Sequence, residues 1–414
     1  MGSQSPPNRG RDTVQCCIAG GGPAAMMLGY LLARAGVEIL VLEKHADFLR
    51  DFRGDTIHPS TLELLHELGL LEEFLKLPHQ EARTIGARIG GVEYPVADFR
   101  HLPTECKFIA FMPQWDFLDF LARQAAGYPG FELRTNTEVI DLIEDAGRVV
   151  GVRARSPDGP LEIRADLVVA ADGRDSILRA QAGLRVQDLG APMDVLWFQL
   201  PVQAGDPEQP VACFGVSQIF IMIYRGAHWQ CGFVIPKGSG DRIRALGLDA
   251  FRGAIGKLAP FVGDRVAVLQ RWEDIKLLSV RVDRLRRWHR PGLLCIGDAA
   301  HAMSPVGGVG INLAIQDAVA AANRLSMPLR DGRLSADHLR QVQRRRELPA
   351  RITQRFQILA QNRIISNVLS RAPDGTNAIK PPLVLRLLAR FPALRRIPAR
   401  LIGIGIRPEH IGSE

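Results

Sequence analysis

The stretch that most constrains the fold is VQCCIAGGGPAAMMLGYLLARAGVEILVLEK at residues 14–44. An apolar run, a glycine-rich turn, an apolar helix and a second apolar run follow one another here, which is typical of a βαβ unit. Gly20 and Gly22 allow backbone N–H groups to approach a pyrophosphate at the helix N-terminus, where the helix dipole favours negative charge. Ala25 fills the third small position of the pattern, and Glu43 can accept the ribose hydroxyls of an adenosine. The unit therefore predicts a bound dinucleotide without a 2′-phosphate, with a tight turn that binds no ligand as the alternative.

A second glycine-rich segment, IGDAAHAMSPVGGVGINLAIQDA at residues 296–318, decides which dinucleotide we expect. It predicts a strand that ends near Asp298, followed by a helix that begins near Gly310. A ligand that reaches from Gly20 to Asn312 must be long, with phosphates at one helix start and a polar ring at another, and FAD fits this description. Asp298 is suited to hold ribityl hydroxyls. The second helix would stabilise negative charge on the reduced flavin by up to about 2 kcal/mol.

Three motifs, taken in order, resemble those of the class A flavin-dependent monooxygenases, which are single-component aromatic hydroxylases of the p-hydroxybenzoate hydroxylase and ubiquinone-biosynthesis hydroxylase type. They are GGGPAAMMLG at 20–29, DLVVAADGRDSILR at 166–179 and the segment at 296–318. The resemblance implies a mixed α/β fold, in which a Rossmann-like FAD-binding domain is interleaved with an antiparallel-sheet substrate domain and followed by C-terminal helices. It also implies that NADPH or NADH reduces FAD transiently, and that one oxygen atom of O2 reaches the substrate through a C4a-hydroperoxyflavin.

The resemblance extends to individual positions. It implies that Arg53 reaches the FAD diphosphate, that Gln114 lies near the flavin, and that the backbone of Val139 meets the adenine. Asp172 would help to orient FAD and the nicotinamide, and Pro305 would form part of the wall on the oxygen side of the flavin. The predicted cofactor-binding residues are Gly20, Gly22, Ala25, Glu43, Lys44, Arg53, Gln114, Val139, Asp172, Asp298, Pro305, Gly308, Gly310, Ile311 and Asn312. No residue is identified as a catalytic base.

Several of these residues also have a simpler structural interpretation. Arg53 could form a surface ion pair with a nearby carboxylate, and Asp172 could cap the helix that follows it. His58 and His301 have no second ligand at metal-binding spacing, so we interpret them as structural and predict no metal site.

Segments of alternating polarity, such as DVLWFQLPV, QIFIMIYR and HWQCGFVIPK, predict antiparallel strands in the middle of the chain. We assign a discontinuous FAD-binding domain to residues 12–85, 107–189 and 285–345. A substrate-binding sheet covers 86–106 and 190–284, and a basic helical segment covers 346–414. The candidates for an apolar substrate pocket are Trp197, Phe220, Tyr224 and Phe233, although each could equally be part of the core. No paired carboxylates or arginine cluster indicate a small acidic substrate, so we expect a lipophilic aromatic or polyketide-like one.

The net charge of +8 is concentrated at the end of the chain. Residues 340–414 contain 14 Arg and one Lys against four acids, a net +11, so the rest of the chain sums to −3. Apolar residues at helical spacing separate these arginines, which favours helices packed on the body as a lid. A peripheral membrane contact and a solvated basic face are the alternatives. No aromatic stacking platform accompanies the arginines, so we expect no nucleic-acid partner.

The predicted function is an FAD-dependent, NAD(P)H-consuming monooxygenase. A flavin-dependent prenyl reductase of the geranylgeranyl type is the main alternative, and a GDI-like binding module without flavin is another. A halogenase is disfavoured because Cys231 and Phe233 replace the tryptophans of its W-x-W-x-I-P signature. The six cysteines lack disulfide-scaffold spacing and the chain shows no signal-peptide or membrane-spanning run, so we expect a cytoplasmic protein.

Overall fold

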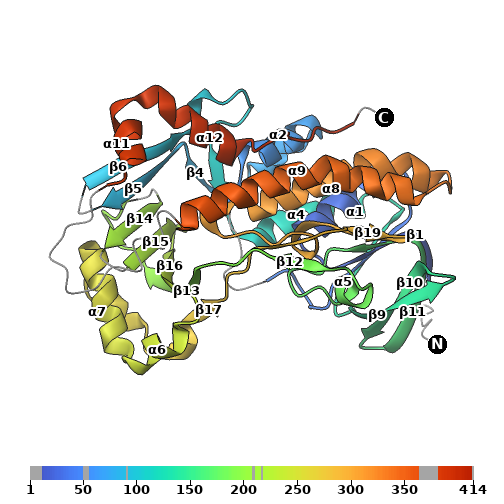
Figure 1. Cartoon of the computed structure of the whole chain (residues 1–414), viewed down its shortest axis with the longest axis horizontal. Helices are drawn as coiled ribbons and strands as arrows, with labels where there is room; N and C mark the ends of the chain where they lie inside the picture. Colours follow the sequence, from blue (N-terminus) through green and yellow to red (C-terminus); the bar gives the residue numbers. More distant parts are fainter. Residues whose placement is uncertain are drawn as a thin grey trace, which may run out of the picture.

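The computed structural model describes residues 12–49, 56–89, 92–207, 210–215, 218–362 and 381–412. Two sheets lie next to each other in the molecule, and the long helices α8 (Gly310–Arg330) and α9 (Ala336–Ala360) run alongside both (Figure 1). The mixed α/β fold predicted from the sequence is confirmed.

The first sheet has eight strands and is built around the N-terminal βαβ unit. Parallel neighbours follow the order β20, β11, β1, β2 and β8, while β19 and the pair β9 and β10 add antiparallel strands. The bounds are β1 (Thr13–Ala19), β2 (Ile39–Leu42), β8 (Phe131–Arg134), β9 (Glu138–Asp145), β10 (Arg148–Ser156), β11 (Gly159–Ala170), β19 (His289–Arg290) and β20 (Leu293–Cys295). Strands β1 and β2 are apolar on both faces because a parallel sheet is covered on both sides.

Helix α1 (Pro23–Arg34) lies on this sheet with α4 (Gln114–Ala126) and α8, and their side chains share one core. The close packing depends on Gly29, since a Cβ there would lie 3.0 Å from the Phe131 ring and 3.1 Å from Val41. The short helix α2 (Pro59–Glu67) follows β3 (Thr56–Ile57) and joins the same core.

The second sheet has seven strands in the order β17, β13, β16, β15, β14, β5 and β6. Its bounds are β5 (Thr84–Ile89), β6 (Val92–Asp98), β13 (Met193–Pro201), β14 (Val211–Gly215), β15 (Gln218–Tyr224), β16 (His228–Pro236) and β17 (Lys276–Leu278). The three segments predicted as antiparallel strands are β13, β15 and β16, and they pair as predicted. Helices α6 (Gly240–Ala245) and α7 (Leu248–Leu258) lie beside this sheet (Figure 1), and α7 packs on one of its faces.

The C-terminal tail packs on the body. Helices α11 (Leu383–Arg390) and α12 (Arg396–Gly403) lie against β6, and a Cβ at Gly403 would lie 2.7 Å from Leu102. Residues 405–412, which we call the C-terminal strap, then cross towards α2 (Figure 1). The predicted boundary at 345/346 falls inside α9, which continues without interruption, and the other domain boundaries stay predictions. Every helix in the described part of the chain is too short or too polar to cross a bilayer.

Candidate active site

The glycine-rich turn brings the ends of two strands together. Gly20 follows β1 with φ +100°, and a Cβ there would lie 2.5 Å from the carbonyl oxygen of Ala171, just after β11. Among the described residues, nothing lies within 4 Å of the corresponding position at Gly22, immediately before α1 begins at Pro23. The first turn of α1 is apolar, so no side chain of its own neutralises the positive end of the helix dipole. An anionic pyrophosphate suits this position.

Glu43 lies at the end of β2 beside the turn, with 7% of its surface exposed. Its Oε2 accepts a 2.7 Å hydrogen bond from the Gly21 N–H, and its Oε1 accepts one from the His45 N–H at 3.0 Å. These contacts fix the carboxylate where the ribose was predicted to bind. Lys44 is exposed next to it, and Arg53 lies outside the described residues.

The N-termini of α1 and α8 meet at Gly297. A Cβ at Gly297 would lie 3.2 Å from the methyl group of Ala24 in α1 and 3.2 Å from that of Ala314 in α8. The Gly297 N–H donates to Asp317 Oδ2 at 3.1 Å, which ties the turn to α8. Gly310 and Ile311 form the uncharged start of α8, and the contacts of Gly297 bring the first turns of α1 and α8 close together.

Two motifs each add a carboxylate to this region, Asp172 from the motif at 166–179 and Asp298 from the segment at 296–318. Asp172 Oδ2 accepts hydrogen bonds from the N–H groups of Ile177 at 2.9 Å and Leu178 at 3.4 Å, so it caps the short helix α5 (Ile177–Gln181). Its Oδ1 is buried without a partner in the described part of the chain, and burial raises the pKa of this carboxyl group. Asp298 is half-buried and lies 3.5 Å from Arg174 Nη2.

Asn312 was predicted to contact the flavin, but its side chain is engaged by the protein. Its Oδ1 accepts from the His58 N–H at 2.9 Å and the Thr61 hydroxyl at 2.7 Å, and its Nδ2 donates to the carbonyl of Thr56 at 3.1 Å. Any cofactor contact of Asn312 would therefore come from its main-chain N–H. Gly308 also lies against Thr56, since a Cβ there would approach Thr56 Oγ1 to 2.6 Å.

Three glutamines, two in α9 and one directly after it, hold the loop that carries Pro305, and the sequence analysis did not identify them. Gln354 Nε2 donates to the carbonyl of Ala302 at 3.1 Å. Gln357 donates to the carbonyls of Ser304 and Val306 at 2.9 and 2.8 Å and accepts from the Ser304 N–H, while Gln361 donates to the Ser304 hydroxyl. The signal was their spacing, which places polar residues on one helix face that would otherwise be apolar.

His301 lies in a buried polar network. Its Nε2 is 2.6 Å from Asp317 Oδ2, and Asp317 Oδ1 accepts from Arg346 Nε at 3.1 Å. Burial by itself would raise the pKa of Asp317, but the His301 ring and the Arg346 guanidinium outweigh it and hold this pKa below its usual range.

His58 donates from its ring to the carbonyl of Ile402, and burial lowers the pKa of His58 to about 4. Across the described residues, no group of three potential metal ligands is found.

The four aromatic substrate candidates divide between the two faces of the second sheet. Phe220 and Phe233 are buried in the core under α7, and Tyr224 packs against the same core. Trp197 lies on the opposite face, in an apolar cluster that includes Val306 from the loop after Pro305. Side chains alternate along a strand, so Phe220, Tyr224 and Phe233 point away from that loop, and only Trp197 faces it.

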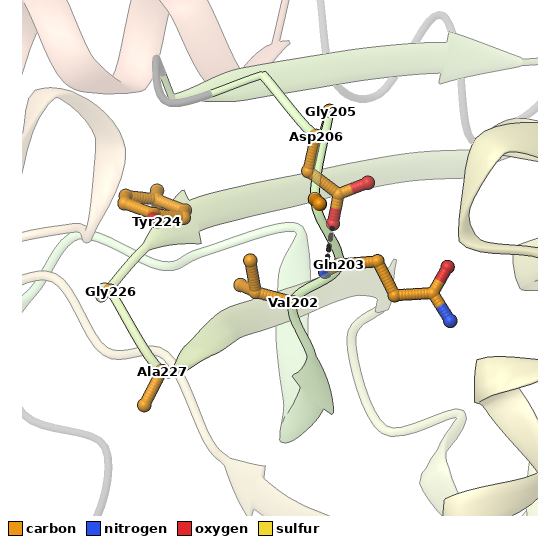
Figure 2. Close-up of a pocket in the computed structure, with 8 residues that line it drawn as sticks. Val202, Gln203, Gly205, Asp206, Tyr224, Gly226 and Ala227 are labelled. Atoms are coloured by element: carbon orange, nitrogen blue, oxygen red, sulfur yellow. Dashed lines mark hydrogen bonds between the residues drawn. The ribbon is translucent and has the colours of Figure 1, made fainter.

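Tyr224 also lines a hollow of about 330 Å³ where β13 ends and β15 turns into β16 (Figure 2). Its other walls are formed by residues 202–206 and by Gly226 and Ala227, and the Gln203 N–H donates to Asp206 at 3.0 Å. None of the three motifs contributes to this hollow. We therefore do not associate it with the cofactor.

The remaining predicted residues have less specific surroundings. Gln114 is the half-buried first residue of α4, and Val139 is half-buried in β9, where it pairs with Ala154. Ala25 is fully buried in α1. Their contacts with a cofactor stay predictions.

The family model described as an FAD binding domain matches residues 13–356. The chain belongs to this family. It is an FAD-dependent monooxygenase of class A, as predicted, and the prenyl reductase alternative is not favoured.

The relatives of this monooxygenase support the assignment. This chain is 32% identical to the 6-methylpretetramide 4-monooxygenase of Streptomyces rimosus, and the match covers 97% of this chain and 94% of that protein. It is 30% identical to the 12-dehydrotetracycline 5-monooxygenase/anhydrotetracycline 6-monooxygenase of Streptomyces rimosus subsp. rimosus over 73% of this chain, but spans only 60% of that longer protein. The crystal structure of p-nitrophenol 4-monooxygenase PnpA from Pseudomonas putida DLL-E4 has the same fold, with a TM-score of 0.74, 19% identity, and coverage of 94% of this chain and 97% of that chain.

The residues of the site fit FAD. The open approach at Gly22 and the apolar first turn of α1 suit the pyrophosphate, and the converging start of α8 suits a ring that gains negative charge on reduction. The orphaned Asp172 Oδ1 is a buried acceptor that the described protein residues do not satisfy, as expected of a group that serves a ligand.

Proposed function

We propose that the substrate of this monooxygenase is a polycyclic aromatic polyketide. The observation that carries the proposal is the apolar face of the second sheet, where Met193, Val195 and Trp197 pack towards Val306 next to the start of α8. A face of this kind suits a flat lipophilic molecule and excludes water. The names of the two Streptomyces relatives, which act on pretetramide and tetracycline compounds, support the same substrate class.

Separate segments of the protein would bind separate parts of FAD. The turn at Gly20 and Gly22 and the start of α1 would bind the pyrophosphate, while Asp298 would accept hydrogen bonds from ribityl hydroxyls. The N–H groups at the start of α8 would stabilise negative charge on the flavin ring. When bound, FAD supplies the acceptance of hydride from NAD(P)H and the activation of O2. Pro305, held by the α9 glutamines, would shape the wall beside the flavin.

The test is a panel of tetracyclic and tricyclic phenols and ketones, added to the FAD-loaded protein with NADPH or NADH. We expect slow oxidation of the nicotinamide alone and a large acceleration by members of the panel, with one 18O atom from 18O2 in the product by mass spectrometry. A product that gains two hydrogens and no label, or a reaction that depends on halide, would contradict the proposal. Acceleration without an altered product would count against these compounds as substrates.

We also propose that the tail contacts an anionic membrane surface. Leu383, Val384, Leu387, Phe391, Leu394 and Ile397 of the segment from α11 to α12 are between 37% and 68% exposed. Arginines at 386, 390 and 396 accompany them, and the sequence has no acidic residue between Asp374 and Glu409. Exposed apolar side chains among cations suit an anionic lipid surface. We place the protein in the cytoplasm, where its reductant NAD(P)H is available.

Co-sedimentation with phosphatidylglycerol vesicles tests the membrane contact. The double variant Leu387→Glu and Phe391→Glu should lose binding, and high salt should weaken binding of the wild type. Leu246→Glu is the matched control, because Leu246 is 70% exposed at the end of α6, away from the tail. Equal binding by both variants would contradict the proposal.

A further inference from the structure

Two hydrogen-bond donors are buried without partners on the face of the second sheet that points to Val306. They are the indole Nε1 of Trp197 and the amide Nε2 of Gln230, and neither has a hydrogen-bond partner among the residues that the structure describes. Gln230 is 6% exposed. A buried donor that is left unpaired costs roughly 1–3 kcal/mol, so two on one face call for an explanation.

The strand register places the two donors next to each other. Trp197 in β13 pairs with Gly232 in β16, and Gln230 is the next residue of β16 on the same face. Residues two apart on a strand are separated by about 6.6–6.8 Å, and diagonal cross-strand neighbours by about 7–8 Å. The two side chains therefore leave the sheet within the span of one aromatic ligand.

Gly232 gives Trp197 its position. A Cβ at Gly232 would lie 3.1 Å from Cζ3 and 3.2 Å from Cη2 of Trp197, so the six-membered ring of the indole covers this glycine. Ile221 pairs with Gly232 from the other side, in β15, and is half-buried. The indole thus forms a flat apolar platform that carries a polar N–H.

Gln230 lies between two apolar clusters on the same face. Trp197 belongs to the cluster that contains Val306, in the loop of residues 302–306 that carries Pro305 and that we call the flavin loop. Ile223, which pairs with Gln230, belongs to a second cluster that includes Phe111 and Ala399 of the tail helix α12. The two donors therefore lie between an apolar cluster at the flavin loop and an apolar cluster at the tail.

We propose that Trp197 and Gln230 form an acceptor site that binds a keto or phenolate oxygen of the aromatic substrate and so determines which part of the ring system faces the flavin. The indole N–H is a donor only, and the amide NH2 is a second donor, so the matching ligand group is an acceptor oxygen. This inference rests on the proposed function for the substrate class. The site distinguishes ketones from hydrocarbons because unpaired donors penalise a ligand that lacks the oxygen.

The test compares 9-fluorenone with fluorene, which share one tricyclic shape and differ in the keto oxygen. Equilibrium dialysis against the FAD-loaded protein measures both dissociation constants without turnover. We expect the wild type to bind the ketone about tenfold more tightly, and Trp197→Phe and Gln230→Leu each to lose about tenfold for the ketone and less than twofold for fluorene. Trp272→Phe is the matched control, since Trp272 is half-buried against the core under α7, on the other face.

Thermal unfolding without ligand provides an independent readout. Replacing an unpaired buried donor by an apolar group of the same shape is nearly neutral or stabilising, so Gln230→Leu should not unfold at a lower temperature than the wild type by more than about 1 °C. Trp197→Phe is not used for this readout, because the smaller ring leaves a cavity that has its own cost. A clear loss of stability in Gln230→Leu would mean that the amide donor is already paired in the folded protein, which would overturn the inference.

The binding result and the proposed function can fail separately. Equal affinities of the wild type for the two probes, or equal losses for both probes in the variants, overturn the acceptor site even if 18O enters a product. The expected binding pattern without any 18O incorporation supports the acceptor site and rejects the proposed substrate class.

Discussion

The C-terminal strap should be stabilised by one buried carboxylate. Glu409 Oε1 accepts from Arg345 Nε at 2.6 Å and lies 3.3 Å from Arg346 Nη1, while its own N–H donates to Gln316. The side chains of Glu409 and Arg346 are 4% and 1% exposed. Glu409→Gln keeps the shape and removes the charge, so that Arg345 loses the carboxylate it pairs with and Arg346 keeps Asp317 as its charged partner.

The size of the effect follows from this burial. Removing one partner of a buried ion pair costs about 3–5 kcal/mol, and we take about 3 because Arg346 keeps Asp317 and the amide keeps an acceptor. An unfolding entropy of about 2.1 cal/mol/K per residue gives about 0.9 kcal/mol/K for the whole chain. The melting temperature should therefore fall by about 3 °C if the protein unfolds as one unit.

The assay is thermal unfolding of the FAD-loaded protein, followed by flavin fluorescence and by circular dichroism. Glu67→Gln is the matched control, because Glu67 contacts the same strap through the Ile411 N–H at 2.7 Å but is 24% exposed in its side chain. We expect the control to lower the melting temperature by no more than about 1 °C. Equal shifts for the two variants, or no shift for Glu409→Gln, would refute the account of a buried charge network.

Three further predictions concern the cofactor turn, the ribityl site and acid stability. Gly20→Ala should abolish FAD retention on a desalting column, because its Cβ would lie 2.5 Å from the Ala171 oxygen at φ +100°; a yellow variant would contradict this. Asp298→Ala should weaken FAD affinity about 10- to 100-fold through loss of a charge-assisted acceptor, measured by fluorescence titration, whereas Asp175→Ala, 73% exposed in its side chain, should not. Burial would raise the pKa of Asp206, but pairing with Arg265 outweighs it and lowers this pKa to about 2. Ionised Asp206 therefore stabilises the fold at pH values above its pKa in the unfolded chain, near 4, and this contribution is lost as the pH falls towards about 2. Asp206→Asn should flatten the dependence of the free energy of unfolding on pH in that window.

The sequence by itself determined the cofactor-binding architecture. The turn at Gly20 needs a residue without Cβ, and the spacing from Gly20 to Glu43 allows few structures other than a βαβ unit. The three motifs indicated the class of enzyme. Alternation of polarity along β13, β15 and β16 also identified their antiparallel pairing correctly, because a period of two is a local property of a strand.

Only the tertiary structure decided which side chains meet. The period of two puts Trp197 and Phe198 on opposite faces of the sheet but does not say which face meets the flavin loop. In the structure Trp197 is on that face, and Phe220 and Phe233 lie in the core under α7. Likewise, nothing local marks Glu409 as the partner of Arg346, which lies 63 residues away. Buried polar groups must find partners wherever the folded chain supplies them, so these contacts depend on packing between distant segments and not on neighbouring residues.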